Sequence, residues 1–252
     1  MLKIENLHFA YGRSSKDVLC GSSLDLAQGQ VGILLGKNGS GKTTLFKTLL
    51  GIEKPKKGSI TLRGENLLKL STIQRARRIA YVPQDIRFGD LTVFDSVLMG
   101  RISYFGMQAG REDYEATEKL LGDMGLLELA HRNVTELSGG ERQKIAVARA
   151  MAQQPQMMVF DEPTGNLDIA NEQLIIREAK KLAKEKNIAI LSSLHDLNQA
   201  LALGDRFFFL KEGVVKYAGG REIFTPEVIK DIFDADVELL QTEGKTVIVN
   251  KF

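Results

Sequence analysis

The chain has 252 residues, 43% hydrophobic and 26% charged, which is typical of a globular protein, and its formal net charge of +2 is too small to argue for a nucleic-acid-binding surface. A single cysteine, Cys20, excludes an internal disulfide framework and favours a reducing compartment. The first residues predict no secretory signal, and no apolar run approaches the ~20 residues that cross a bilayer, so we expect any membrane role to come through a partner.

Two strands are predicted before the first glycine-rich segment. Residues 2–9 alternate between apolar and polar side chains, and residues 18–27 form a second strand that can pair with them. Tyr11 follows the first strand. Its position alone favours an ordinary strand-end tyrosine packed in a core over an aromatic ring that stacks on adenine.

A glycine-rich segment follows the apolar run 31–35 and precedes a predicted helix. It consists of Gly36, Lys37, Asn38, Gly39, Ser40, Gly41, Lys42, Thr43 and Thr44, which match the P-loop pattern G-x-x-x-x-G-K-[ST]. Strand, loop and helix in this order place backbone N–H groups and the positive end of a helix dipole around a hollow that binds phosphates. In such a loop Lys42 reaches the β- and γ-phosphates and the Thr43 hydroxyl ligates Mg²⁺. The alternative, a glycine turn with a solvated lysine, is disfavoured by this order, and we predict nucleotide binding.

A short helix and a strand are predicted next. Ser71 is expected to cap the helix, whose arginines favour a solvated face over a binding patch: Arg75, Arg77 and Arg78. A buried strand over residues 79–82 ends just before Gln84. This side chain can orient water or Mg²⁺ near a γ-phosphate, although most glutamines in such places only decorate a loop.

From residue 91 to about 154 the apolar pattern is helical. Helices are predicted at residues 92–100, 111–124 and 141–153, which indicates a helical subdomain inserted between strand-rich halves. Within it, Leu137, Ser138, Gly139, Gly140 and Glu141 precede the last helix. Ser138 and Glu141 fit a capping box, but a capping box does not require two adjacent glycines. The glycines let a backbone approach closely, so this helix start is a second candidate phosphate site.

Two acidic residues, Asp161 and Glu162, follow the buried strand 157–160. Ligand groups gather at the carboxyl ends of strands in open α/β sheets, so both carboxylates are expected to face the P-loop. Asp161 suits a Mg²⁺ shell, and Glu162 suits the general base that orients an attacking water. Asp168 is expected to cap the helix that runs to about residue 185.

His195 follows another buried strand, predicted over residues 188–191. A lone histidine is usually structural, but at a strand end in a P-loop sheet it can donate a hydrogen bond to a γ-phosphate. A hairpin is predicted over residues 207–217. Beyond it, a helix after Thr225 and two short strands suggest a small appendage.

Taken together, these segments resemble the ATP-binding cassette of ABC transporters over nearly the whole chain, because six motifs appear in the family's order. The resemblance implies an α/β fold, with a P-loop NTPase RecA-like core, an antiparallel β subdomain and an inserted α-helical subdomain. The core with its β subdomain would be residues 1–85 and 155–218, the helical subdomain 86–154, and the appendage 219–252.

The resemblance also implies a role for each motif. Tyr11 would stack on adenine, residues 36–44 would be the Walker A loop, and residues 157–162 would be the Walker B strand with its catalytic Glu162. Gln84 would be the Q-loop glutamine at the transmembrane contact, Asp168 part of the D-loop, and His195 the switch histidine. Mg²⁺ would accompany ATP on Thr43, Gln84 and Asp161.

Residues 137–141 match the family's signature motif, and in this family two copies close head to tail around two ATP molecules. Each ATP would lie between one copy's Walker A loop and the other copy's Ser138, Gly139 and Gly140. Hydrolysis would then reopen the dimer and drive transport through integral-membrane permease subunits.

Finer resemblance, carried by residues 91–101, 135–143 and 195–201, is to importers of iron–siderophore, haem and cobalamin. It implies a prokaryotic subunit at the cytoplasmic face of the membrane, bound to a permease and indirectly served by a substrate-binding protein. A zinc or manganese importer and an exporter cassette remain alternatives. A DNA- or ribosome-acting ATPase of the family is disfavoured, because no long coiled coil and no second P-loop occur, and no nucleic-acid partner is expected.

Overall fold

The computed structural model describes residues 1–12, 16–84, 86–163, 169–242 and 245–251. The chain divides into two compact units, Met1–Leu70 with Ile176–Phe252, and Ser71–Ile175. We call them the first and the second unit and describe each by itself. The division falls within helix α6, Ile169–Glu185. The subdomains expected from the family resemblance are defined by function and not by compactness, so their bounds stay a prediction.

An antiparallel sheet opens the first unit. Its strands are β1 (Leu2–Phe9), β2 (Leu19–Leu26), β4 (Lys57–Leu62) and β5 (Glu65–Asn66), in the spatial order β2-β1-β4-β5. The inward positions of β1 shift by one residue in the middle of the strand, because Asn6 adopts a positive φ of 48° and the pairing is irregular there. The 3₁₀ turn η1, Leu67–Lys69, follows β5.

A second sheet of the first unit carries the P-loop. Its central strand β3 (Val31–Leu35) pairs in parallel with β8 (Ala189–Ser193) on one side and with β9 (Arg206–Lys211) on the other. All five residues of β3 are buried, as is typical of a parallel strand covered on both faces. Strand β10 (Val214–Gly219) forms the predicted hairpin with β9.

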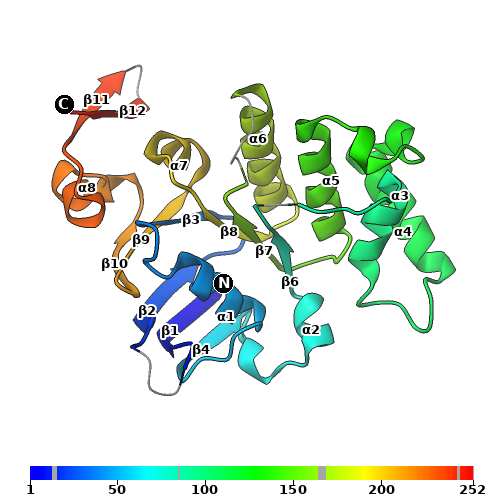
Figure 1. Cartoon of the computed structure of the whole chain (residues 1–252), viewed down its shortest axis with the longest axis horizontal. Coiled ribbons are helices and arrows are strands. Elements are labelled where there is room, and N and C mark those ends of the chain that lie inside the picture. The colour runs from blue at the N-terminus through cyan, green and yellow to red at the C-terminus, as the bar shows by residue number, and fades with distance from the viewer. Residues whose placement is uncertain (13–15, 85, 164–168, 243–244, 252) are drawn as a thin grey trace. The chain divides into compact units, whose positions relative to one another are not determined.

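Two helices follow strands of this second sheet. Helix α1 (Lys42–Leu50) follows the P-loop and ends at Gly51, whose left-handed φ of 75° stops the helix. Helix α7 (Leu197–Leu203) links β8 to β9 and is capped at its start by Asp196. Helix α7 packs beside β3 (Figure 1).

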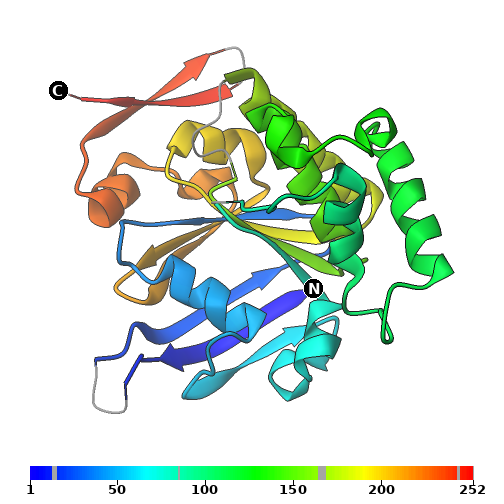
Figure 2. The ribbon, with the colours of Figure 1, turned by 45° about the vertical axis from the view of Figure 1, so that its right-hand side comes forward.

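The last part of the first unit is a small helix and a separate hairpin. The 3₁₀ turn η5 (Arg221–Ile223) leads into α8 (Pro226–Phe233), and the hairpin consists of β11 (Val237–Thr242) and β12 (Lys245–Asn250). Figure 2 shows this hairpin clear of the two sheets of its own unit. The Asn198 side chain of α7 holds it, donating to the Ile248 carbonyl at 3.0 Å and accepting from the Ile248 N–H at 2.8 Å.

The second unit contains two parallel strands and several helices. Strand β6 (Ile79–Val82) pairs with β7 (Met157–Asp161). Its described helical elements are α2 (Thr72–Ala76), α3 (Val93–Leu98), η2 (Met99–Arg101), α4 (Arg111–Asp123), η3 (Leu127–Leu129), η4 (Val134–Glu136) and α5 (Gly139–Met151). Helices α3, α4 and α5 lie side by side in Figure 1.

A buried ion pair joins the helices of the second unit. Arg101 donates to an Asp113 carboxylate oxygen at 2.8 Å, and the two side chains are only 8% and 9% exposed. Arg101 also donates to the carbonyl of Ala152 at 3.2 Å, just beyond the last residue of α5. The pair therefore ties η2 to both α4 and α5. Because both charges are removed from water, loss of one partner would leave the other uncompensated.

One expectation about the arginines after Ser71 was wrong. Ser71 caps α2 as expected, but the helix ends at Ala76, so Arg77 and Arg78 lie beyond it. The Arg77 side chain is half-buried and has partners within the protein: it donates twice to the Ser103 carbonyl, at 2.9 and 2.6 Å, and lies 4.6 Å from the centre of the Tyr104 ring. A short aromatic loop distant in sequence binds it, and charge patterning cannot reveal such a partner.

Candidate functional site

The P-loop is a tight turn between β3 and α1. At Gly36 an added Cβ atom would lie 2.3 Å from the Leu210 carbonyl oxygen, so only glycine lets the loop pass β9 so closely. Gly41 is the N-cap of α1, with a left-handed φ of 109° and no side-chain capping bond. Glycine offers no capping side chain to the first N–H groups of α1, and such a helix start is suited to an anion.

The Lys42 side chain extends from the start of α1 back to the first residues of the loop. Its ammonium donates to the carbonyl oxygens of Gly36, at 2.7 Å, and Lys37, at 3.2 Å, and the residue is only 7% exposed. The charge is thus held inside the turn by backbone carbonyls that a phosphate can replace. Thr43, in contrast, is exposed at the start of α1 and can offer its hydroxyl to a metal ion or a phosphate.

Tyr11 lies beside the P-loop helix. Its hydroxyl and that of Thr44 are 3.1 Å apart, and its ring meets Phe9 edge to face at 4.9 Å. The alternative of a tyrosine packed in a core is wrong, since Tyr11 is 59% exposed. The exposed ring is free to stack on a planar base, as predicted by the resemblance.

His195 leaves the same sheet edge as the P-loop. Strands β3 and β8 are parallel neighbours with Leu34 opposite Ser193, so both chains emerge at their carboxyl ends. The histidine lies exposed in the bend between β8 and α7. The first unit therefore brings the P-loop, Tyr11 and His195 into one part of the fold.

The acidic residues and Gln84 form a second group, within the second unit. Val82 of β6 lies opposite Phe160 of β7, so Gln84 and Glu162 leave the carboxyl edge of the same strand pair. Asp161 is the last residue of β7, and Glu162 turns away with a positive φ of 51°. The two adjacent carboxylates thus belong to different backbone conformations, which permits different roles.

Tyr81, one strand away, contacts Asp161. Its hydroxyl donates to the Asp161 Oδ2 atom at 3.2 Å. Burial, followed by the charge of Asp161 and this hydrogen bond, raises the pKa of Tyr81, so the phenol stays protonated as a donor. The sequence does not predict this contact, because Tyr81 stands in an apolar strand 80 residues before its partner.

The start of α5 is the predicted capping box. The Ser138 N–H and hydroxyl both donate to Glu141 Oε2, at 2.9 and 2.7 Å, and the Glu141 N–H donates back to Ser138 Oγ at 3.3 Å. The bond from the Ser138 hydroxyl, then that from its N–H, lowers the pKa of Glu141. Gly139 is exposed and Gly140 buried, while Leu137 is buried just before the helix. Asp168, the remaining predicted residue, lies outside the described residues.

Oxygen donors fit Mg²⁺, a hard cation, and each unit taken by itself offers one: the first unit the Thr43 hydroxyl, the second unit the Asp161 carboxylate. In the described part of the chain, no group of three or more His, Cys, Asp or Glu side chains is placed to hold a metal. Mg²⁺ is usually bound by one or two carboxylates together with water and substrate phosphates, so a sparse donor set of this kind suits it.

This fold and the P-loop define a P-loop nucleoside triphosphatase. A family model described as ABC transporter matches residues 19–165. The chain is 38% identical to an uncharacterized ABC transporter ATP-binding protein of Methanocaldococcus jannaschii, with 99% of this chain and 97% of that protein covered. The chain therefore belongs to the ABC transporter family and is an ATP-hydrolysing subunit of that family.

Two named importer subunits are also similar. The iron(3+)-hydroxamate import ATP-binding protein FhuC of Bacillus subtilis is 33% identical, with 97% of this chain and 91% of that protein covered. The hemin import ATP-binding protein HmuV of Thermobifida fusca is 33% identical, with 92% of this chain and 82% of that protein covered.

Solved structures agree with this fold. An inward-facing structure assigned to the metal-chelate type of ABC transporter has a TM-score of 0.81 at 29% identity, with 98% of this chain and 95% of that chain covered. A dimeric ATP-binding cassette in a post-hydrolysis state, bound to ADP and Pi, has a TM-score of 0.73 at 28% identity, with 87% and 98% covered. In the described part of the chain, no helix is both long and apolar enough to span a bilayer.

Proposed function

We propose that two copies of this chain close around two ATP molecules and that their closure powers import through a permease. The observation that carries the proposal is the presence of two helix starts suited to phosphate, α1 with its uncapped Gly41 and α5 with its adjacent glycines. They lie at distant positions in the chain. In a pair of copies, the α1 start of one and the α5 start of the other would share one nucleotide.

Within that site the residues divide the work of phosphoryl transfer. The Tyr11 ring holds the adenine, and the P-loop N–H groups with Lys42 hold the phosphates and balance the charge that develops on the transferred group. Glu162 accepts a hydrogen bond from the attacking water and orients it, and Gln84 and His195 contact the γ-phosphate region. Mg²⁺, held by Thr43, Gln84 and Asp161, would supply further charge neutralisation on the phosphate oxygens.

The partners follow from the same proposal. The chain would bind integral-membrane permease subunits at the cytoplasmic face of a prokaryotic cell membrane, with Gln84 at the contact. A substrate-binding protein would act on the other side of the permease, without touching this chain. The similarity to named importer subunits supports an importer over an exporter cassette.

We infer a metal chelate as the cargo. Relatives with 33% identity are named for import of iron(3+)-hydroxamate and of hemin, and both cargoes are metal chelates. The zinc or manganese importer is the remaining alternative. The cassette itself does not contact the cargo, so the residues of this chain carry no cargo site.

Substitution of the proposed base tests the hydrolytic role. Glu162→Gln keeps the size of the side chain but removes the carboxylate, so we expect ATP hydrolysis to fall at least about 100-fold while ATP binding is retained. Steady-state hydrolysis and the binding of a fluorescent ATP analogue measure the two effects. Glu128→Gln, an exposed glutamate of η3, is the matched control. Hydrolysis by Glu162→Gln at the wild-type rate would exclude Glu162 as the base.

The cargo is tested by uptake in a strain that lacks the chain. We expect uptake of labelled iron–hydroxamate, haem or cobalamin to be lost and zinc uptake to be unchanged. The wild-type chain should restore the lost uptake, and the Glu162→Gln chain should not. Loss of zinc uptake alone would favour the alternative importer.

A further inference from the structure

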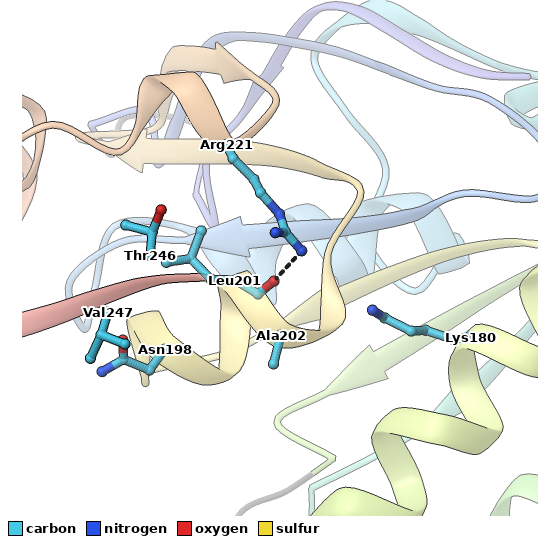
Figure 3. Close-up of a pocket in the computed structure, with 7 residues that line it drawn as sticks. All are labelled: Lys180, Asn198, Leu201, Ala202, Arg221, Thr246 and Val247. Carbon is cyan, nitrogen blue, oxygen red and sulfur yellow. Dashed lines mark hydrogen bonds between the residues drawn. The ribbon is translucent and has the colours of Figure 1, made fainter. Parts of the chain in front are cut away.

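A cavity of about 450 Å³ lies in the first unit, away from the P-loop. Its walls come from α6, α7, η5 and the start of β12, and Figure 3 shows the side chains that line it. Cavities of this size hold small organic molecules, whereas a single inorganic ion would leave most of the space to water. The lining does not include the P-loop, Tyr11 or His195, so the cavity is a separate place in the fold.

The charges in the lining are positive. Lys180 of α6 and Arg221 of η5 extend toward Ala202, near the C-terminal end of α7, in Figure 3. Among the described residues of the lining, their companions are apolar or neutral, and none of these carries an acidic side chain. Two cations at a hollow with partly apolar walls create a positive potential that attracts an anion.

A purely structural role explains only one of these cations. Arg221 donates to the Leu201 carbonyl at 3.2 Å, as cations often do near the C-terminal end of a helix. Lys180 is half-buried, and among the described residues its ammonium has no hydrogen bond or ion pair. A half-buried ammonium without a partner favours a ligand that supplies the missing negative charge.

The remaining lining describes the rest of such a ligand. Leu201, Ala202 and Val247 present apolar surface beside the two cations. A ligand that fills the cavity therefore needs an acidic group and an apolar body. We propose that this cavity binds a small organic anion, whose acidic group lies between Lys180 and Arg221 and whose apolar part contacts Leu201 and Val247.

The chain between two of the cavity walls, η5 and β12, also reaches the nucleotide loop. One wall, β12, is held to α7 by the paired hydrogen bonds between Asn198 and Ile248. The segment between Arg221 and β12 contains Asp234, which forms an ion pair with Lys37 of the P-loop. A ligand in the cavity would bridge α6, α7 and β12 and would thereby hold the hairpin in place.

The first experiment measures binding of 2-naphthoate by calorimetry to the protein saturated with Mg-ADP, so that the P-loop is already filled. The neutral isostere 2-naphthamide tests the need for charge. We expect the acid to bind at least about tenfold more tightly than the amide, and Lys180→Gln to weaken the acid about tenfold. Equal binding of acid and amide, or no binding of the acid, would overturn the proposal.

A matched variant separates the cavity from general surface charge. Lys181→Gln removes the same charge one residue away, from an exposed position outside the lining, and should leave the affinity unchanged. If Lys181→Gln weakens naphthoate as much as Lys180→Gln does, binding is non-specific and the proposal fails. Unchanged Mg-ADP affinity in both variants shows that each is folded, independently of the proposed transport role.

A structural readout completes the test. Because the ligand would bridge α7 and β12, naphthoate should slow amide hydrogen exchange in residues 246–250 in the wild-type protein but not in Lys180→Gln. Exchange that is unchanged at saturating naphthoate would place the ligand elsewhere and overturn the assignment of this cavity.

Discussion

Glu162 combines a candidate catalytic carboxylate with an unusual backbone. Its positive φ of 51° costs a non-glycine residue about 1–2 kcal/mol, and it follows directly on Asp161, the last residue of β7. Strand β7 ends at Asp161, and the positive φ of the next residue places Glu162 in the turn that follows the strand. The backbone of Asp161 is therefore fixed by the sheet, whereas that of Glu162 is set by the turn.

Tyr81 is expected to act as a positioning residue for Asp161. Its hydrogen bond to Oδ2 orients the carboxylate that the proposed function assigns to Mg²⁺. Groups that hydrogen-bond a metal ligand typically contribute about 10–100-fold to metal affinity, so Tyr81→Phe should weaken Mg²⁺-dependent nucleotide binding about tenfold. Binding of Mn²⁺ with ADP, followed by electron paramagnetic resonance, measures this without relying on hydrolysis.

Tyr104→Phe is the control for that measurement. It also deletes a phenol hydroxyl of the second unit, but one that donates to the Gln153 carbonyl at 2.9 Å and not to Asp161. Metal affinity should not change. If nucleotide binding without metal falls equally in Tyr81→Phe, the role of Tyr81 is structural.

At the scale of elements, α8 is attached to β9 and β10 through one carboxylate. Asp231 accepts hydrogen bonds from Lys216 at 2.6 Å, from Lys211 at 3.1 Å and from the Tyr217 hydroxyl at 3.2 Å. The bond from Lys216, then that from Lys211, lowers the pKa of Asp231 to about 2. Because the folded state favours the ionised carboxylate, this attachment stabilises the protein above the ordinary pKa of 3.8 and is lost as the pH falls toward 2.

Asp231→Asn should therefore lower the thermal midpoint at pH 7. The difference from the wild-type protein should shrink between about pH 4 and pH 2, because the wild-type carboxylate becomes protonated there. Circular dichroism melts at several pH values give both curves. Asp236→Asn, which removes a more exposed carboxylate paired only with Lys230, should have a smaller effect. A constant difference across this pH range would contradict the role assigned to Asp231.

Most elements could be predicted from the sequence, and most of their partners could not. Residues 2–9 and 31–35 form strands with the predicted bounds, because alternation and continuous apolarity are local signals. Ser71 and Ser138 cap helices as predicted. In contrast, the binding of Arg77 by the loop at Ser103 depends on tertiary packing, which no local pattern contains.

At the scale of the whole molecule, the proposed site requires two copies, and Ser138 is the residue that tests this. Ser138→Arg places a bulky cation where the second copy's nucleotide would dock. We expect ATP binding to each monomer to persist and ATP-driven dimerisation to be lost, as measured by gel filtration with Mg-ATP in the Glu162→Gln background.

A second capping box provides the control. Ser71 and Gln74 form at α2 the same arrangement as Ser138 and Glu141 at α5. Ser71→Arg therefore removes an equivalent cap, at a cost of about 1 kcal/mol, without touching the signature motif. Dimerisation should survive this change. If both variants stay monomeric, lost helix stability explains the result, and if Ser138→Arg still dimerises, the proposed interface is wrong.

More of the candidate site than of the packing around it could be predicted from the sequence. The P-loop and the start of α5 carry glycines and capping residues in a fixed local order, so the local sequence predicts the backbone conformation of each. The contacts of Tyr81 with Asp161 and of Lys37 with Asp234 join residues 80 and 197 positions apart. Their formation depends on strand order and on the placement of α8, which local sequence does not specify.

The capping box at Ser138 gives the proposed assembly a built-in reversibility. In the free chain, the Ser138 N–H and hydroxyl already hold one anion, the carboxylate of Glu141. A phosphate that takes up this hydroxyl must displace a group of like charge, so docking exchanges one anion for another and the number of hydrogen bonds hardly changes. The helix start would then contribute to docking only the difference in binding free energy between the phosphate and the Glu141 carboxylate. In the proposed assembly, Glu141 would return to Ser138 when the phosphate leaves, so separation of the two copies would not leave this helix start uncapped.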